Sequence, residues 1–153
     1  MKTIKNLTFA ALLATLLLQP SRASADASAP ILLTFEKSRV PGPGPVPYRF
    51  HFDGSFGGDF TGTLFTGVLV AVPIDEPRQI FHLEADYVLA DGEGNHLLTA
   101  HVQGNQNNHT RQAVLNGVVT DGAFQGAQVH VEFDVLGGGR FQGTIRILPA
   151  SAD

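Results

Sequence analysis

Residues 81–89 read FHLEADYVL, and this stretch decides the fold class. Its odd-numbered positions are all apolar, and the even-numbered positions carry His82, Glu84 and Asp86 before Val88. Because successive side chains of a β-strand point to opposite faces, this order places apolar groups on one face of a sheet and polar groups on the other. Residues 48–53 and 128–135 alternate in the same way. The alternation predicts an antiparallel sheet with one face in contact with water.

The same period of two extends along most of the chain, and no segment carries the apolar stripe and caps of a helix. We expect eight strands at residues 30–37, 48–54, 58–72, 79–90, 95–104, 111–120, 126–136 and 140–148. Glycine-rich or polar turns separate several of them, and the proline-rich run at 41–47 predicts an extended loop because proline lacks the ladder donor. The predicted fold is all-β and antiparallel, an eight-stranded closed β-barrel with little or no helix.

A Gly-x-Phe-x-Gly motif occurs at residues 58–62, 122–126 and 139–143, with a looser copy at 54–58. In a strand, the two glycines and the phenylalanine of each copy share one face. The glycines then leave room for sharp strand coiling, which a small closed barrel needs at its corners. Within the third predicted strand, Val68 to Val72 is apolar on both faces, which predicts a bulge or burial by a partner subunit there.

The N-terminal 25 residues have the three parts of a cleavable signal peptide. Lys2 and Lys5 precede an uncharged, mostly apolar run at 7–18, and Ala23-Ser24-Ala25 supplies the cleavage pattern. An apolar helix of that length spans about 18 Å, too little for a bilayer core of about 30 Å. We therefore expect a signal at 1–25, a single barrel domain at 26–153, and export from a bacterial cell to the periplasm or the medium, with no membrane anchor after cleavage.

Charge and cysteine content exclude several classes of protein. The 153 residues carry ten Lys and Arg against fourteen Asp and Glu, and they contain no Cys. Removal of residues 1–25 leaves seven basic and fourteen acidic groups, a formal charge of −7. A disulfide-stapled miniprotein and a polybasic nucleic-acid binder are both excluded, so we expect no nucleic-acid partner.

Two segments resemble a known family. Residues 117–127, GVVTDGAFQGA, and residues 85–95, ADYVLADGEGN, are similar to strand and turn segments of the allene oxide cyclase-like and dirigent-like barrels. The resemblance covers residues 80–148. It implies an eight-stranded antiparallel barrel, often secreted and oligomeric, that holds a small apolar substrate, with isomerase or cyclase activity. No residue here matches a catalytic position of the family, so the catalytic residues stay unknown.

The chain has six histidines: His51, His82, His96, His101, His109 and His130. Three of them form His-x-acid pairs with Asp53, Glu84 and Glu132, which would share one face of a strand. None of the six has the spacing of a zinc set. We expect these pairs to face solvent, with a surface metal site as the weaker alternative, and we expect no metal and no cofactor.

The apolar face supplies the candidates for binding. Inward projection of the alternating rows predicts that six aromatic residues line the barrel interior: Tyr48, Phe52, Phe81, Tyr87, Phe133 and Phe141. A small barrel either fills its interior with such groups or holds one small ligand. Tyr87 is the strongest single candidate for orienting a ligand, because a buried phenol needs a hydrogen-bond partner.

Three functions remain open at this point. The leading one is a secreted, soluble barrel that binds a small apolar molecule, with isomerase or cyclase activity as an extension. The second is a packed structural module that forms a homo-oligomer through Val68–Val72. The third is a small outer-membrane barrel, which fits poorly with only two Tyr, no Trp and no aromatic C-terminus.

Overall fold

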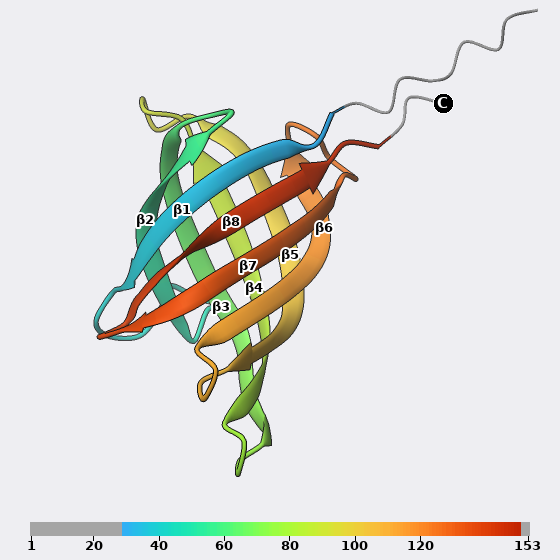
Figure 1. Cartoon of the computed structure of the whole chain (residues 1–153). Coiled ribbons are helices and arrows are strands. Elements are labelled where there is room, and N and C mark those ends of the chain that lie inside the picture. The colour runs from blue at the N-terminus through green and yellow to red at the C-terminus, as the bar shows by residue number, and fades with distance from the viewer. Residues whose placement is uncertain (1–28, 151–153) are drawn as a thin grey trace, which may run out of the picture.

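Eight antiparallel strands close into one barrel in the computed structural model, which describes residues 29–150 (Figure 1). The strands are β1 (Ile31–Arg39), β2 (Phe50–Gly58), β3 (Gly62–Asp75), β4 (Ile80–Ala90), β5 (His96–Asn107), β6 (Gln112–Gly122), β7 (Gln128–Gly137) and β8 (Arg140–Leu148). Each strand pairs with the next one along the chain, and β1 pairs with β8. The predicted fold class is confirmed, and residues 29–150 contain no helix. The predicted signal at 1–25 lies outside the described residues.

Strand boundaries differ most from the prediction around β2. This strand continues to Gly58, beyond the expected end at residue 54, because Phe52, Gly54 and Phe56 keep the inward alternation. The turn to β3 falls at residues 59–61 instead. The structure also has the bulge predicted in β3, since its register with β4 shifts between Val68 and Val70.

Two of the three glycine–phenylalanine motifs form turns, so their assignment to strands was wrong. Gly58, Gly122 and Gly126 have positive φ angles of 111°, 86° and 87°, which favour a turn at 58–62 and at 122–126. Phe60 and Phe124 are exposed at these turns, with ring centroids 6.2 Å apart. In the third copy Phe141 does lie in a strand and faces the interior.

Inward-facing glycines allow neighbouring strands to approach closely. A Cβ atom on Gly54 would collide with the carbonyl oxygen of Glu36, and one on Gly143 would collide with that of Glu132. Both glycines belong to the motif copies that lie within strands, where they serve the coiling expected of a small barrel.

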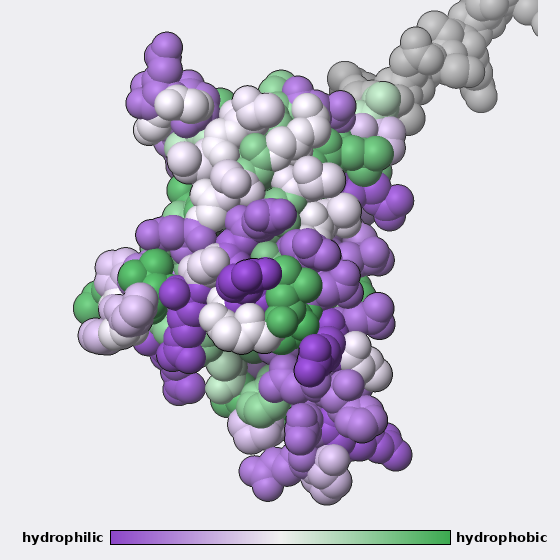
Figure 2. All heavy atoms as spheres, turned by 60° about the vertical axis from the view of Figure 1, so that its left-hand side comes forward, coloured by the Kyte–Doolittle hydropathy of each residue, from purple (hydrophilic) through white to green (hydrophobic). Residues whose placement is uncertain are grey.

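The interior differs between its two ends. Near the start of β1 and the end of β8 it is filled by packed side chains, mostly aliphatic: Leu33, Phe56, Leu64, Leu89, Leu98, Val119, Val129 and Ile147. Toward the end that carries the β3–β4 hairpin, which we call the aromatic end, six of the inward side chains are aromatic: Phe50, Phe52, Phe81, Tyr87, Phe133 and Phe141. Charged side chains lie mostly outside, and the face shown in Figure 2 has hydrophilic areas beside near-neutral and hydrophobic ones. No helix within residues 29–150 is long and apolar enough to cross a membrane.

Candidate ligand-binding site

The aromatic end of the barrel contains a cavity of about 390 Å³. Its walls are the inward side chains of β1 to β8 at the end where β2, β4, β6 and β8 begin. Five phenylalanines contribute to them: Phe50, Phe52, Phe81, Phe133 and Phe141. The polar side chains of Arg39, Gln106 and Asn108 also line the cavity, at the ends of β1 and β5. An apolar cavity of this size with a few polar groups is typical of small-molecule sites.

A lysine forms part of this cavity wall. Lys37 follows Phe35 on the inward row of β1, and only 5% of its surface is exposed. Its Nζ atom lies 2.7 Å from the hydroxyl oxygen of Tyr87 on β4, and 3.5 Å from Oγ1 of Thr66 on β3. These two hydroxyls are the hydrogen-bond partners that the structure gives the amine.

Aromatic rings surround the amine on several sides. The Nζ atom of Lys37 lies 4.4 Å from the ring centroid of Tyr87 and between 5.0 and 5.9 Å from those of Phe35, Phe52, Phe133 and Phe141. The negative faces of such rings stabilise a cation, although less than water or a carboxylate would. The amine is therefore held in a largely apolar enclosure.

Burial changes the proton affinity of both partners. It lowers the pKa of Lys37 from 10.5 to about 7, because an apolar enclosure disfavours the ammonium form. Burial likewise raises the pKa of Tyr87 well above its usual value of 10.0. No ion pair of the described residues includes Lys37. Near neutral pH the pair is thus a protonated phenol beside an amine that exists in both charge states.

Sequence reasoning missed Lys37, although one signal was available. Ile31, Leu33, Phe35 and Lys37 occupy alternate positions of one strand, and β1 buries the inward row in the order that this alternation requires. A lysine that continues an apolar row either leaves the sheet or lies inside it. Because lysine side chains are usually exposed to water, an inward position for Lys37 was not expected from the sequence.

Five of the six predicted interior residues line the cavity: Phe52, Phe81, Tyr87, Phe133 and Phe141. Their contact with a ligand stays a prediction. Tyr48 does not line it, and its expected inward position was wrong. The chain turns at residues 45–47, so Tyr48 precedes β2 and is not part of its alternation.

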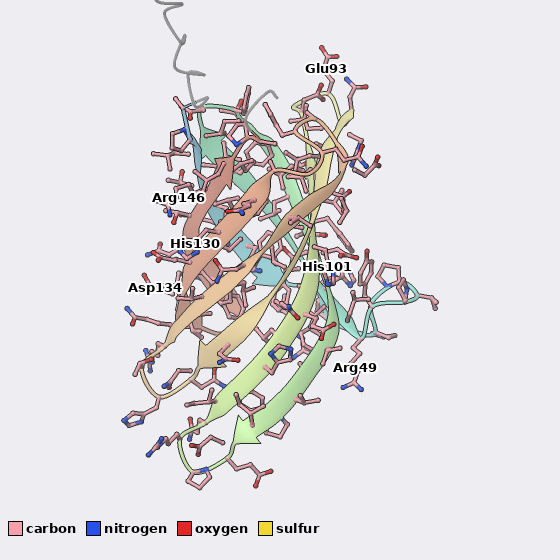
Figure 3. The ribbon with its side chains drawn as sticks, turned by 90° about the vertical axis from the view of Figure 1, so that its right-hand side faces the viewer. Arg49, Glu93, His101, His130, Asp134 and Arg146 are labelled. Atoms are coloured by element: carbon pink, nitrogen blue, oxygen red, sulfur yellow. The ribbon has the colours of Figure 1, made fainter. Side chains whose placement is uncertain are left out.

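Tyr48 instead packs on the outer face of the barrel. Its ring covers Gly67, where a Cβ atom would overlap it, and meets Phe65 edge-on with centroids 5.6 Å apart. Its hydroxyl donates a hydrogen bond of 2.9 Å to Oδ2 of Asp86, while Nδ1 of His101 lies 2.9 Å from Oδ1 of the same carboxylate. Partial burial and the Asp86 carboxylate raise the pKa of Tyr48 to about 12. Figure 3 shows His101 on the flank of the barrel that also carries Arg49.

Two of the three predicted His-x-acid pairs lie on the outward face, as expected, and in the described part of the chain His51 forms no hydrogen bond or ion pair with Asp53. His82 lies 3.5 Å from Glu84, and His130 lies 2.8 Å from Glu132, each at the next outward position of the same strand. His51 stacks on Phe65, and its Nδ1 atom is buried without a hydrogen-bond partner among the described residues. Within residues 29–150, no three His, Asp or Glu side chains are grouped so that they could hold a metal ion.

A scan of family models finds no match to this chain, and neither do searches of the curated proteins and of the solved structures.

Proposed function

We propose that this protein binds one small, largely apolar molecule in the cavity at the aromatic end of the barrel. The single observation that carries the proposal is the buried amine of Lys37 among the aromatic rings of the cavity wall. A solid core gains nothing from an enclosed lysine, since burial of the ammonium is unfavourable and a hydrophobic residue of similar volume would be more stable. A binding site needs such a group to fix the orientation of its ligand.

The two polar groups beside Lys37 define the part of the ligand that would reach them. Tyr87 and Thr66 each present a hydroxyl next to the amine. The ligand should therefore carry a hydrogen-bonding oxygen at one end and an apolar body that contacts the phenylalanines. Arg39, Gln106 and Asn108 would contact any polar group at the other end.

The cavity also bears on the alternatives. A structural module with a packed core does not require a cavity. The cavity therefore supports ligand binding over the structural-module alternative. An outer-membrane barrel has apolar side chains toward lipid and a polar lumen. Here the buried apolar residues face inward and most charged residues face outward, which supports a barrel that functions in water. Isomerase or cyclase activity rests on the family resemblance and stays a prediction.

Displacement of a fluorescent dye tests the proposal. Anilinonaphthalene sulfonate should bind the purified protein, and small apolar compounds with one polar end should displace it. Ala71 lines the cavity, so Ala71→Phe should weaken dye binding at least about tenfold, which is about 1.4 kcal/mol. The neighbouring residue Val70 pairs with the outward-facing Glu84, and Val70→Phe is the matched control that should leave binding unchanged. Equal loss in both variants, or no dye binding in either, would contradict the proposal.

We also propose export, on the strength of residues 1–25. The mass of the protein recovered from the periplasm or medium of a bacterial host should correspond to a chain that begins at Asp26. Recovery of the uncleaved chain from the cytoplasm would contradict it. Native mass spectrometry of the same sample would report a retained ligand and the number of subunits.

A further inference from the structure

Lys37 is the one lysine among residues 29–150, and it is enclosed in the cavity instead of lying on the surface. Its position is set by the strand and not by a flexible loop, because β1 pairs with β2 on one side and β8 on the other at this point. Gly54, opposite Lys37 on β2, has no Cβ atom that would collide with the β1 backbone. The fold thus holds a primary amine at a fixed place in an apolar cavity.

We propose that Lys37 forms a covalent imine with the carbonyl carbon of a small apolar aldehyde or ketone in this cavity, and that the Tyr87 hydroxyl is the proton donor. This inference rests on the proposed function and names the chemical class of its ligand. A lysine in an apolar pocket is a well-established nucleophile toward carbonyl compounds, because the neutral amine carries the reactive lone pair.

The surroundings of Lys37 favour the neutral amine. Burial removes water from Nζ, and no carboxylate of the described residues pairs with it. The five aromatic rings within 6 Å of Nζ replace that hydration only in part. With a pKa of about 7, the neutral fraction at neutral pH is on the order of a thousand-fold larger than for an ordinary lysine. Of the other charged groups, Arg39 lines the cavity, with its guanidinium over the ring of Phe50.

The neighbouring hydroxyls fit a carbonyl better than a carboxylate. A carbonyl oxygen needs one donor, and the Tyr87 hydroxyl lies 2.7 Å from Nζ, close to where that oxygen would be during attack. Beside Nζ, a carboxylate brings a full charge and several lone pairs among aromatic rings, where the donors are Lys37, Tyr87 and Thr66. Three further polar groups line the cavity at the ends of β1 and β5: Arg39, Gln106 and Asn108. The carboxylate would lose its hydrogen bonds to water, and the donors beside Nζ would replace only some of them.

The reaction balances without a further reactant. The Lys37 lone pair forms the C–N bond while the carbonyl π bond breaks, and the oxygen takes the proton of the Tyr87 hydroxyl to give a carbinolamine. Tyr87 recovers a proton from the nitrogen. The carbinolamine hydroxyl then takes the Tyr87 proton and leaves as water while the nitrogen lone pair forms the C=N bond. The Tyr87 phenolate recovers its proton from the iminium nitrogen, which leaves the neutral imine. The net change is amine plus carbonyl to imine plus water, with no oxidation or reduction.

Reductive trapping tests this chemistry on the full-length protein. Cuminaldehyde, an apolar aromatic aldehyde, is incubated with the protein and sodium cyanoborohydride at pH 7, and peptide mapping locates the reduced adduct. Among residues 29–150 we expect a single adduct, at Lys37, formed at least about tenfold faster than on free Nα-acetyl-lysine at the same pH. Adducts on Lys2, Lys5 or the α-amine fall in other peptides and are counted separately. Lys37→Arg keeps a positive charge but should form no adduct within residues 29–150. Tyr87→Phe should react at the same residue but at least about tenfold more slowly, since a positioned acid contributes such factors.

Dye displacement by cuminate, the carboxylate that matches cuminaldehyde, distinguishes failure of the imine proposal from failure of the proposed binding function. If cuminaldehyde displaces the dye but leaves no adduct at Lys37, the imine is overturned and the binding function stands. If cuminate displaces the dye more strongly than the aldehyde does, the site takes an anion and the imine is overturned. If neither compound displaces the dye and no adduct forms, the proposed binding function fails together with the imine. A Tyr87→Phe variant that reacts as fast as the unchanged protein would overturn the role of Tyr87 alone.

Discussion

The two tyrosines of this chain lie on opposite sides of the same barrel wall. Tyr87 is 1% exposed inside the barrel and contacts Lys37, whereas Tyr48 lies outside and donates to Asp86, the residue before Tyr87 on β4. Both phenols have a raised pKa, but for different reasons. Burial accounts for Tyr87, while Tyr48 combines partial burial with a neighbouring carboxylate. The comparison shows that one strand supports an apolar site on one face and a hydrogen-bonded network on the other.

Replacing each tyrosine by alanine should give the largest difference in stability between the two sites. Tyr87→Ala should lower the free energy of unfolding by about 3–5 kcal/mol, because it leaves a void in a packed wall and removes a partner of the Lys37 amine. Tyr48→Ala should lower it by about 1–2 kcal/mol, since the ring is partly exposed and its hydroxyl loses one hydrogen bond. Urea unfolding at pH 7 measures both values. Equal values for the two variants would show that the outer site stabilises the barrel as much as the inner one.

Substitution of Lys37 should change how stability depends on pH. The unfolded lysine titrates near 10.5 and the folded one near 7, so between these pH values the unfolded chain binds more protons. The free energy of unfolding should therefore rise by up to about 1.4 kcal/mol per pH unit within this window. Lys37 destabilises the folded protein most below pH 7. Lys37→Met should remove this rise, and at pH 6 it should be more stable than the unchanged protein by about 1–4 kcal/mol.

The measurement is the difference in free energy of unfolding between Lys37→Met and the unchanged protein from pH 6 to pH 9.5. This difference cancels groups that both proteins share, and the range ends before tyrosine ionisation. Lys37→Met also leaves the Tyr87 hydroxyl without its partner, so Lys37→Met/Tyr87→Phe is the control. A difference that stays constant across the range would contradict the lowered pKa of Lys37.

A methyl group at Gly67 should break the outer site while the inner one stays intact. The Cβ atom of Gly67→Ala would overlap the ring of Tyr48, so the ring must leave the outer face and its hydroxyl must leave Asp86. We expect a loss of about 1 kcal/mol, because the displaced side chain is free to move into solvent. The pKa of Tyr48 should fall from about 12 toward 10, whereas reductive trapping at Lys37 should be unchanged. Loss of trapping would show that the two faces are coupled.

The smallest effect on stability should come from Asp86→Asn. This change removes the negative charge beside Tyr48, so the pKa of Tyr48 should fall below 12 but stay above 10, because partial burial remains its largest cause. The chain has two Tyr and no Trp, so absorbance of the tyrosinate near alkaline pH reports these two groups directly. The free energy of unfolding should change by less than about 1 kcal/mol. A titration curve identical to that of the unchanged protein would contradict the contribution of the Asp86 charge.

The regular parts of this fold could be predicted because their side chains obey one simple period. The alternation at residues 81–89 gives β4 and places Tyr87 inward, and the same argument applies to Phe133. Tyr48 could not be placed this way, since its position depends on a turn before β2 and on the space above Gly67. The same alternation would place Lys37 inward, but lysine side chains are usually exposed to water. Sequence alone does not say when a strand carries a charge inward, because the rings that enclose it come from β1, β2, β4, β7 and β8.

Closure of the barrel between β1 and β8 has a consequence for the order of folding. Ile31 pairs with Ile147, near opposite ends of the described chain, while every other pairing joins neighbouring strands. The neighbouring hairpins form from local contacts, but the last seam must bring together distant segments at a high entropic cost. Until β8 arrives, β1 and β7 present open edges to other chains. A chain shortened before residue 140 should therefore associate with copies of itself through these edges instead of closing into a barrel, so the newly made protein depends on its final strand.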